Sequence, residues 1–135
     1  GANDASFVLR LSYGAASVLL PGDLEARGER LLLSRPLAPV TLLKLGHHGS
    51  RTSSTAAFLD AVAPRVAVVQ AGYRSRFGHP APDVVQRYLD RGVRLERSDR
   101  CGAWAWRTAD DAAAPGAAAL AGLGGLLASR RRRAQ

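Results

Sequence analysis

The segment that most constrains the fold runs from Lys44 to Ser54 and reads Lys-Leu-Gly-His-His-Gly-Ser-Arg-Thr-Ser-Ser. It directly follows the apolar run Val40 to Leu43, which is typical of a short buried strand. Gly46 and Gly49 flank the two histidines and predict a loop with an unusual backbone at the end of that strand. Imidazole is a common metal ligand and acid–base group, so the segment predicts a site at a strand exit. A capping histidine beside a solvated one is the alternative.

Short apolar runs bounded by glycine, proline and polar residues recur along the chain. They predict six strands: Phe7 to Leu11, Ser17 to Leu20, Val40 to Leu43, Arg65 to Gln70, Val93 to Arg97 and Ala103 to Arg107. Apolar residues at helical spacing predict three helices: Leu24 to Leu33, Thr55 to Val62, and a segment bounded by Pro82 and Gly92. Because helices alternate with strands through the middle of the chain, the order predicts an α/β fold, a mixed sheet with packed helices.

A carboxylate follows the second predicted strand. Asp23 ends the segment Pro21-Gly22-Asp23, in which proline and glycine break the strand. Ligands of α/β folds bind at the carboxyl ends of strands, so Asp23 is a candidate metal ligand. Asp23 is also suited to capping the next helix, which carries Glu25 and Glu29 near its start.

Aromatic residues alternate with arginines after the fourth predicted strand. Tyr73, Arg74, Arg76 and Phe77 lie in this loop, and His79 follows them. Aromatic rings stack on bases and arginines bind phosphates, so the pattern favours single-stranded nucleic acid as a ligand. A tyrosine and a phenylalanine packed beneath the loop would give the same pattern.

The charge of the chain also favours a polyanionic partner. The formal net charge is +8, and 15 basic and 9 acidic residues precede Asp110. The excess therefore does not reside only in the run Arg130 to Arg133, and it favours nucleic acid above all. The alternative is an arginine-rich composition with solvated side chains. Cys101 is the only cysteine, which excludes an internal disulfide and a thiolate metal cluster.

Composition divides the chain into two parts. Residues 1–109 are predicted to form the folded domain, and residues 110–135 an Ala/Gly-rich flexible tail that ends in the arginine run. Polar residues near the start argue against a signal peptide. The stretch from Ala112 to Ala128 contains Pro115 and falls short of the ~20 apolar residues of a membrane helix, so no membrane span is expected in this chain.

Taken together, these motifs resemble the C-terminal half of the metallo-β-lactamase-like domain of ComEC, the competence family of DNA-uptake channel proteins. The resemblance rests on segments in unbroken order: Asn3 with Ser6 to Leu11, Pro21 to Asp23, Lys44 to Ser54, Ala71 to Tyr73, Phe77 to Pro80, and Ser98-Asp99. It implies half of an αββα sandwich with the site at the sheet edges. It also implies an extracytoplasmic domain at the bacterial cell membrane that hydrolyses the DNA strand that is not transported.

The resemblance also implies roles for single residues. Asp23 corresponds to the metal-bridging aspartate, and the His47-His48 pair to the last histidine ligand of a divalent ion, manganese or zinc. His47 is favoured over His48 as the ligand because it is nearer the strand end. His48 or His79 is expected to donate a proton to the leaving oxygen. The expected DNA contacts are Lys44, Ser50, Arg51, Ser53, Tyr73, Arg74 and Arg76.

The chain also departs from the family pattern. The His-x-His-x-Asp-His ligand motif of this fold does not occur in it, whereas a catalytic metal usually needs about three protein ligands. We therefore expect a fragment that is inactive alone, partnered in a longer protein by the N-terminal half of the domain and by a membrane channel portion. The alternatives are a DNA-binding module with a vestigial metal site, and a metallo-hydrolase of another phosphodiester or ester.

Overall fold

The computed structural model describes residues 2–108, so the predicted tail at residues 110–135 lies outside the described residues. The chain divides into two compact units, residues 1–103 and residues 104–135. All helices and strands named below belong to the first unit, which also holds every candidate site residue.

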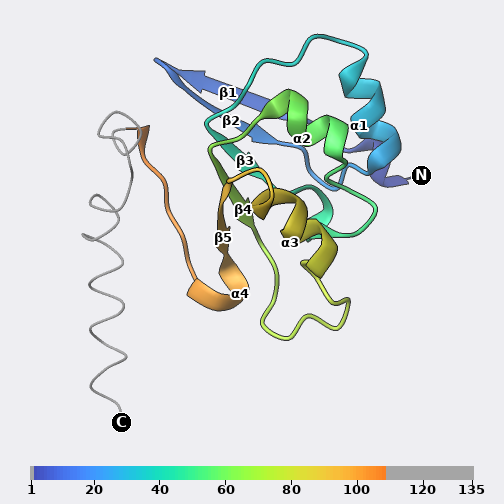
Figure 1. Ribbon diagram of the computed structural model, residues 1–135, viewed down its shortest axis with the longest axis vertical. Coiled ribbons are helices and arrows are strands. Elements are labelled where there is room, and N and C mark those ends of the chain that lie inside the picture. The colour runs from blue at the N-terminus through green and yellow to red at the C-terminus, as the bar shows by residue number, and fades with distance from the viewer. Residues whose placement is uncertain (1, 109–135) are drawn as a thin grey trace. The chain divides into compact units, whose positions relative to one another are not determined.

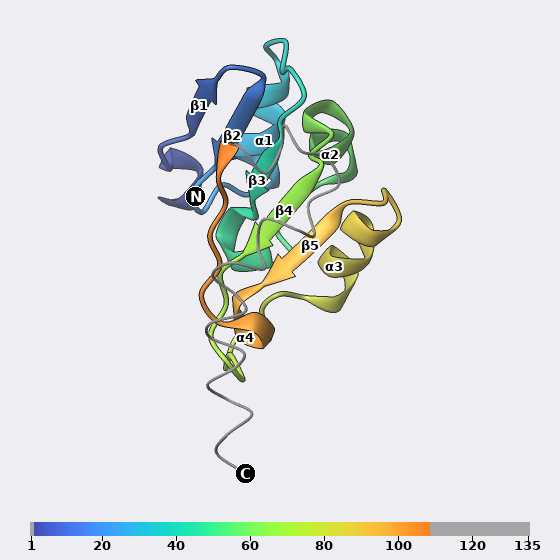
Figure 2. The ribbon, with the colours of Figure 1, turned by 90° about the vertical axis from the view of Figure 1, so that its left-hand side faces the viewer.

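A five-stranded mixed sheet organises this unit (Figure 1 and Figure 2). Its strands lie side by side in chain order: β1 (Leu9–Tyr13), β2 (Ala16–Leu20), β3 (Leu42–Lys44), β4 (Val66–Val69) and β5 (Arg94–Arg97). β1 and β2 form an antiparallel hairpin, whereas β2, β3, β4 and β5 pair in parallel. Tyr13 pairs with Ala16 across a two-residue turn, in which Gly14 adopts a φ of 57° that suits glycine. This tight turn fixes the register of the hairpin.

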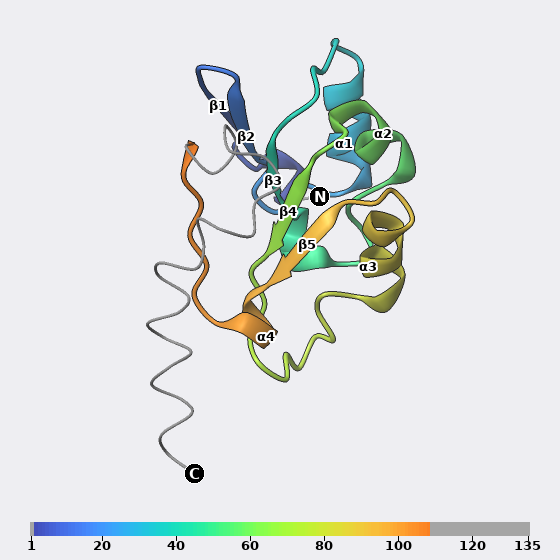
Figure 3. The same ribbon diagram turned by 60° about the vertical axis from the view of Figure 1, so that its left-hand side comes forward.

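A helix joins each pair of neighbouring parallel strands. These helices are α1 (Ala26–Leu33), α2 (Ala56–Val62) and α3 (Pro82–Leu89), and all three lie on one face of the sheet (Figure 3). Two short 3-10 helices, η1 (Ala2–Ala5) and η2 (Gly46–Gly49), and the short helix α4 (Ser98–Cys101) complete the elements. The α/β fold with a mixed sheet, predicted from the sequence, is confirmed. None of the helices described is long and apolar enough to cross a membrane.

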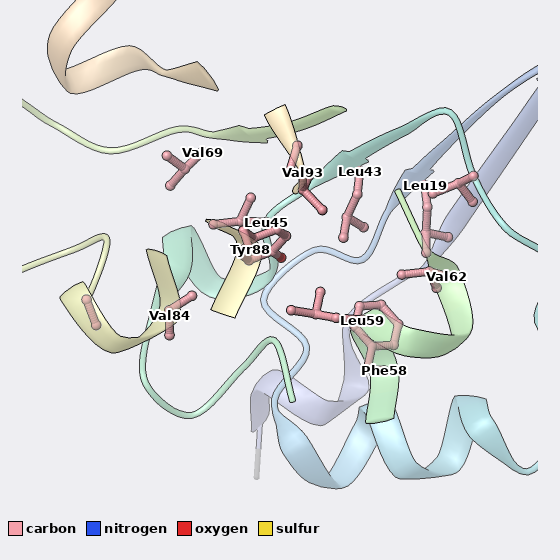
Figure 4. Packing of buried hydrophobic residues seen from close by; sticks show 13 residues of the cluster. Leu19, Leu43, Leu45, Phe58, Leu59, Val62, Val69, Val84, Tyr88 and Val93 are labelled. Atoms are coloured by element: carbon pink, nitrogen blue, oxygen red, sulfur yellow. The ribbon is translucent and has the colours of Figure 1, made fainter. Parts of the chain in front are cut away.

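The core lies between the sheet and these helices (Figure 4). Leu43 and Val69 from the strands pack in one cluster with Phe58 and Leu59 of α2 and Tyr88 of α3, and each is at most 1% exposed. Removing the side chain of a residue such as Leu43 would cost about 2–5 kcal/mol in lost contacts and cavity formation. The core therefore holds the strand ends, and the loops that follow them, in fixed positions.

Alternate residues of the strands point to the other face of the sheet. On β1 these are Leu9, Leu11 and Tyr13, which are 49%, 51% and 77% exposed. Leu19 of β2 points into the core and pairs with Arg10, so Leu9, Leu11 and Tyr13, which alternate with Arg10 and Ser12, lie on the face opposite the helices. A sheet with α1, α2 and α3 on one face and an apolar row on the other corresponds to half of an αββα sandwich.

The predicted bounds of strands and helices differ from the observed ones by up to two residues, and one predicted strand does not form among the described residues. The first strand begins at Leu9 rather than at Phe7, because the tight turn sets the pairing from Tyr13 backwards to Leu9 and Leu20. The predicted strand Ala103 to Arg107 is wrong, since this segment pairs with no strand among the described residues. Helix α4 lies between β5 and this segment. Alternating apolar residues make a strand only where a neighbouring strand offers hydrogen-bonding partners, and the pattern alone does not supply that neighbour.

Candidate functional site

Three loops meet beyond the carboxyl ends of β2, β3 and β4, because these strands run parallel and end at the same edge of the sheet. The first loop carries Asp23, the second carries His47 and His48 and is called the histidine loop, and the third carries His79. The backbone N–H of His47 donates to Gly22 O at 3.1 Å and joins the first two loops. Ala81 N donates to Gly49 O at 2.9 Å and joins the second loop to the end of the third. The structure therefore brings Asp23, the histidine pair and His79 to one edge.

The two histidines have a left-handed backbone. His47 has φ 44° and ψ 44°, and His48 has φ 54° and ψ 23°, which costs each residue roughly 1–2 kcal/mol. Gly49 follows with φ 78°, and a Cβ on it would lie 2.7 Å from Pro80 Cβ. The glycine therefore allows the third loop to pack directly against the histidine loop. Strain held in this way is typical of functional sites.

Ser53 holds the histidine loop from inside. Its hydroxyl lies 2.9 Å from Gly46 O and 3.0 Å from Ser50 O, and the residue has no exposed surface. Ser50 is 7% exposed and its hydroxyl lies 3.1 Å from that of Thr52. Ser50 and Ser53, both expected to contact DNA, are therefore buried residues whose hydroxyls bind within the loop and shape it.

Glu29 supports the same loop from α1. Its side chain is buried, and its two carboxylate oxygens accept the backbone N–H groups of Ser54 at 2.6 Å and of Thr55 at 2.8 Å. Thr55 is the N-cap residue of α2, and its hydroxyl accepts the N–H of Phe58. The histidine loop is therefore fixed at its far end by a buried carboxylate and a capped helix.

His48 and Asp23 face each other across the first two loops. His48 Nδ1 lies 2.7 Å from Gln70 O, and a carbonyl oxygen only accepts, so Nδ1 must carry the proton. In the neutral ring, Nε2 then has a lone pair, and it lies 3.7 Å from Asp23 Oδ1. A cation, a proton or a water molecule that donates to both can lie between two acceptors at this separation.

These two atoms suit a shared divalent ion. Two ligand atoms at about 2.1 Å from a tetrahedral zinc lie about 3.4 Å apart, close to the separation observed. Both side chains are about half exposed, so further ligands and water can approach them. Within residues 2–108, however, no group of three or more His, Cys, Asp or Glu side chains could hold a metal ion. The described residues therefore fit part of a metal shell.

His47 is held by a carboxylate that the sequence analysis did not assign to the site. Glu25 Oε1 lies 3.1 Å from His47 Nδ1. A carboxylate oxygen accepts, so Nδ1 of the neutral ring carries the proton and Nε2 keeps its lone pair. Between the two imidazoles, the geometry favours His48 rather than His47 as the one next to Asp23. The one feature of the sequence that could have pointed to Glu25 as a site residue is its position two residues after Asp23.

His79 enters from the third loop. Its ring centroid lies 5.9 Å from that of His47 and 6.1 Å from the stacked ring of Phe77. Nδ1 is buried and has no hydrogen-bond partner in the described part of the chain. Burial lowers the pKa of His79, and the neighbouring His47 and His48 lower it further. His79 is therefore held in its neutral form, which suits an acceptor better than the proton donor predicted from the sequence.

A pocket of about 790 Å³ opens beside the histidines. Tyr73 and Phe77 are 77% and 68% exposed at its wall, and the guanidinium groups of Arg74 and Arg76 lie 5.4 Å and 4.8 Å from their respective ring centroids. Its lining residues are His48, Gln70, Ala71, Gly72, Tyr73, Arg74, Ser75, Arg76, Phe77, His79 and Ser98. Flat rings and fixed positive charges at an open pocket suit a ligand with bases and phosphates.

Two cations expected to contact DNA lie outside this lining. Lys44 is partly buried and its Nζ lies 3.5 Å from Gly22 O; burial lowers its pKa, and the charge of Asp23 opposes that shift. Arg51 is 76% exposed and lies 3.3 Å from the carboxylate of Asp83. Lys44 therefore belongs to the surroundings of Asp23, and Arg51 to the rim beyond the histidine loop.

Residues 1–73 match the sequence model of the metallo-β-lactamase superfamily. The chain is 42% identical over 103 residues to competence protein ComA of Neisseria gonorrhoeae, which is 75% of this chain and 15% of that protein. It is 35% identical over 106 residues to ComE operon protein 3 of Bacillus subtilis, which is 78% of this chain and 14% of that protein. It is 38% identical over 85 residues to recombination protein 2 of Haemophilus influenzae, 63% of this chain and 11% of that protein. The chain thus spans only a small part of each relative.

Proposed function

Since the chain belongs to the metallo-β-lactamase superfamily and is a ComEC-type domain of that fold, we propose that it forms part of a metal-dependent nuclease of DNA uptake. The observation that carries the proposal is the pair of facing acceptors, Asp23 Oδ1 and His48 Nε2, at 3.7 Å. They lie beside a pocket lined by exposed aromatic rings and arginines. The reaction would be hydrolysis of phosphodiester bonds in the strand that is not transported.

Asp23 and His48 would hold a divalent ion, manganese or zinc, together with ligands from outside this chain. Such an ion lowers the pKa of a bound water to near 7 and neutralises charge on the phosphate. His48 would then act as a ligand rather than as the proton donor. The neutral His79 would accept a hydrogen bond at the same edge, since its pKa is lowered.

The pocket would hold the DNA strand. Tyr73 and Phe77 expose their rings for stacking on bases, while Arg74 and Arg76 pair with phosphates. Stacking on aromatic rings accepts every base, so we expect little sequence preference. Unpaired bases are needed for stacking, which favours a single strand over a duplex.

The longer protein would place this domain on the extracytoplasmic face of the bacterial membrane, next to its channel portion. The N-terminal half of the domain would cover the apolar row on β1, where Leu9, Leu11 and Tyr13 are 49%, 51% and 77% exposed. It would also supply the missing metal ligands. The 135-residue chain alone should therefore bind manganese or zinc weakly, and tight binding that survives Asp23→Ala in a calorimetric titration would place the site elsewhere.

Hydrolysis of single-stranded DNA by the longer protein tests the proposal. With manganese or zinc, Asp23→Asn and His48→Ala should each lower the rate at least ~100-fold, because losing even the outer hydrogen-bond partners of metal ligands costs 10–100-fold. The matched control is Asp60→Asn on α2, which removes the ion pair between Asp60 and Arg91 and should keep the wild-type rate. Full activity of Asp23→Asn would contradict the proposed role of the site.

Binding to DNA can be tested apart from cleavage by adding a chelator that removes divalent metal ions. Affinity should fall with salt, and each arginine that contacts phosphate contributes about 0.7 to the slope of log K against log salt. Arg74→Ala with Arg76→Ala should lower that slope by up to about 1.4, whereas Tyr73→Ala should weaken binding without changing it. An unchanged slope in the double variant would exclude this loop as the phosphate contact.

A DNA-binding module without catalysis is the second candidate. It is favoured because residues 2–108 hold the pocket with its exposed rings and arginines but no group of three metal ligands. The two candidates differ in one result: the longer protein would bind single-stranded DNA in both cases, but only the nuclease would cleave it when metal is added.

A further inference from the structure

One carboxylate oxygen gathers three polar side chains behind the histidine loop. Glu25 Oε1 lies 3.0 Å from Asn3 Nδ2, 3.1 Å from Thr52 Oγ1 and 3.1 Å from His47 Nδ1. These partners come from η1, from the loop after the histidines, and from the histidine pair itself. Glu25 Oε1 therefore links these three segments, and it does so directly beside His47 Nδ1.

Glu25 is not engaged in capping its own helix. It occupies the N-cap position of α1, yet its side chain makes no capping hydrogen bond. Glu29, the next carboxylate of α1, binds the backbone N–H groups of Ser54 and Thr55. The two acids of this helix thus have separate partners, the backbone for Glu29 and side chains for Glu25.

The contact decides which nitrogen of His47 is protonated. Glu25 and a carbonyl oxygen are alike in that they only accept, so the His47–Glu25 contact has the same consequence as the His48–Gln70 contact. Both imidazoles carry the proton on Nδ1 and leave Nε2 with a lone pair. Without Glu25, the nearest remaining partner of His47 Nδ1 is the Thr52 hydroxyl at 3.5 Å, which can either donate or accept.

We propose that Glu25 is a positioning residue, which fixes the ring orientation and the tautomer of His47 so that Nε2 is the nitrogen available to the site. The proposal deepens the proposed function, because a carboxylate behind a histidine is the arrangement that orients ligand or acid–base imidazoles at metal sites. Thr52 and Asn3 assist by donating to the same oxygen and so hold the carboxylate in place.

The tautomer of His47 can be measured without metal or DNA. Long-range proton–nitrogen correlation spectra of the 135-residue chain, labelled with ¹⁵N and recorded about two pH units above the ordinary histidine pKa of about 6.5, report which nitrogen is protonated. The wild-type chain should show His47 protonated on Nδ1. In Glu25→Ala this preference should be lost, whereas Glu25→Gln should keep it because an amide oxygen still accepts.

Two internal comparisons make the result specific. His48, whose Nδ1 donates to Gln70 O, should keep its tautomer in every Glu25 variant, and Asp60→Ala should leave both histidines unchanged. Glu25→Leu keeps most of the side-chain volume and replaces the alanine variant if that one does not fold. If Glu25→Ala or Glu25→Leu lowers the melting temperature but His47 stays protonated on Nδ1, Glu25 is a structural tie only and the proposal is wrong.

The rate of DNA hydrolysis supplies a second readout in the longer protein. Loss of a hydrogen-bond partner behind an imidazole of a metal site typically costs 10–100-fold in metal affinity or activity, so Glu25→Ala should lower the rate by about that factor and Glu25→Gln by less. Equal rates of Glu25→Ala and wild type would overturn the proposal. If the tautomer depends on Glu25 but the longer protein neither binds metal nor cleaves DNA, the proposed function fails while the role of Glu25 in holding His47 stands.

Discussion

The histidine loop should depend on Glu29, a buried carboxylate 25 residues before Ser54 at the far end of the loop. Glu29 is 1% exposed, and its two oxygens accept the backbone N–H groups of Ser54 and Thr55 at 2.6 Å and 2.8 Å. Ser54 has a φ of 59°, a conformation that a serine rarely adopts without such support. Glu29→Ala would remove both acceptors and leave two amides without partners in a mostly buried place.

The expected loss of free energy of unfolding in Glu29→Ala follows from these two hydrogen bonds. Hydrogen bonds to charged groups contribute about 1.5–3 kcal/mol each, and removing the buried charge offsets part of this, so Glu29→Ala should lower the free energy of unfolding by about 3–5 kcal/mol. Glu29→Gln keeps one acceptor oxygen and turns the other into a donor, and should lose about half as much. Urea unfolding followed by circular dichroism measures both values.

The matched control is Asp60→Asn, which removes an exposed ion pair with Arg91 and should cost at most about 1 kcal/mol. The reasoning would be refuted by Glu29 variants that unfold at the same urea concentration as Asp60→Asn. That result would mean that the loop holds its conformation through Ser53 and the strand ends alone.

Three further predictions concern other parts of the fold. Gly49→Ala should lower the free energy of unfolding by at least ~2 kcal/mol, because the new Cβ would lie 2.7 Å from Pro80 Cβ and the backbone φ is 78°. In the same urea assay, Gly72→Ala, whose Cβ would have no atom within 4 Å, should change this free energy by less than ~0.5 kcal/mol. The 135-residue chain should self-associate through the exposed row on β1, and Leu11→Lys should shift it toward monomer in sedimentation velocity without lowering its melting temperature; a monodisperse wild-type monomer would count against this. Two hydrogen bonds from Arg97 lower the pKa of Asp99, so the carboxylate's contribution to stability should be complete above about pH 4 and be lost as the pH falls through the lowered pKa. In the urea assay, the free energy of unfolding of Asp99→Asn should therefore change less than that of the wild type over this acid range, and an equal change in both would exclude the effect.

Local patterns predicted the elements that local chemistry determines. The apolar runs gave five of the strands, and the pairing of Tyr13 with Ala16 across Gly14 follows from turn chemistry. Asp23 and the histidine pair each follow a predicted strand, so the sequence places both at strand exits, whereas the parallel pairing of β2 with β3 brings these exits to one edge. The predicted strand Ala103 to Arg107 failed because strand formation depends on a neighbour that sequence alternation does not reveal.

The finer chemistry of the site was beyond the sequence because it depends on contacts between distant residues. Glu25 meets His47, and Glu29 meets Ser54, across 22 and 25 positions of the chain. The distance along the chain favoured His47 as the imidazole beside Asp23, whereas it is His48 whose Nε2 lies 3.7 Å from Asp23 Oδ1. Ser53 could not be recognised as buried, since its neighbours in sequence are polar.

The central claim is that Asp23 and His48 share a divalent ion. Anomalous diffraction from manganese-soaked crystals of the complete domain, this chain together with its upstream residues, tests it most directly. We predict an anomalous peak bonded to both Asp23 Oδ1 and His48 Nε2, at about 2.0–2.3 Å from each, and the loss of that peak in Asp23→Ala. A peak bonded to neither atom, or one that persists in Asp23→Ala, would contradict the account.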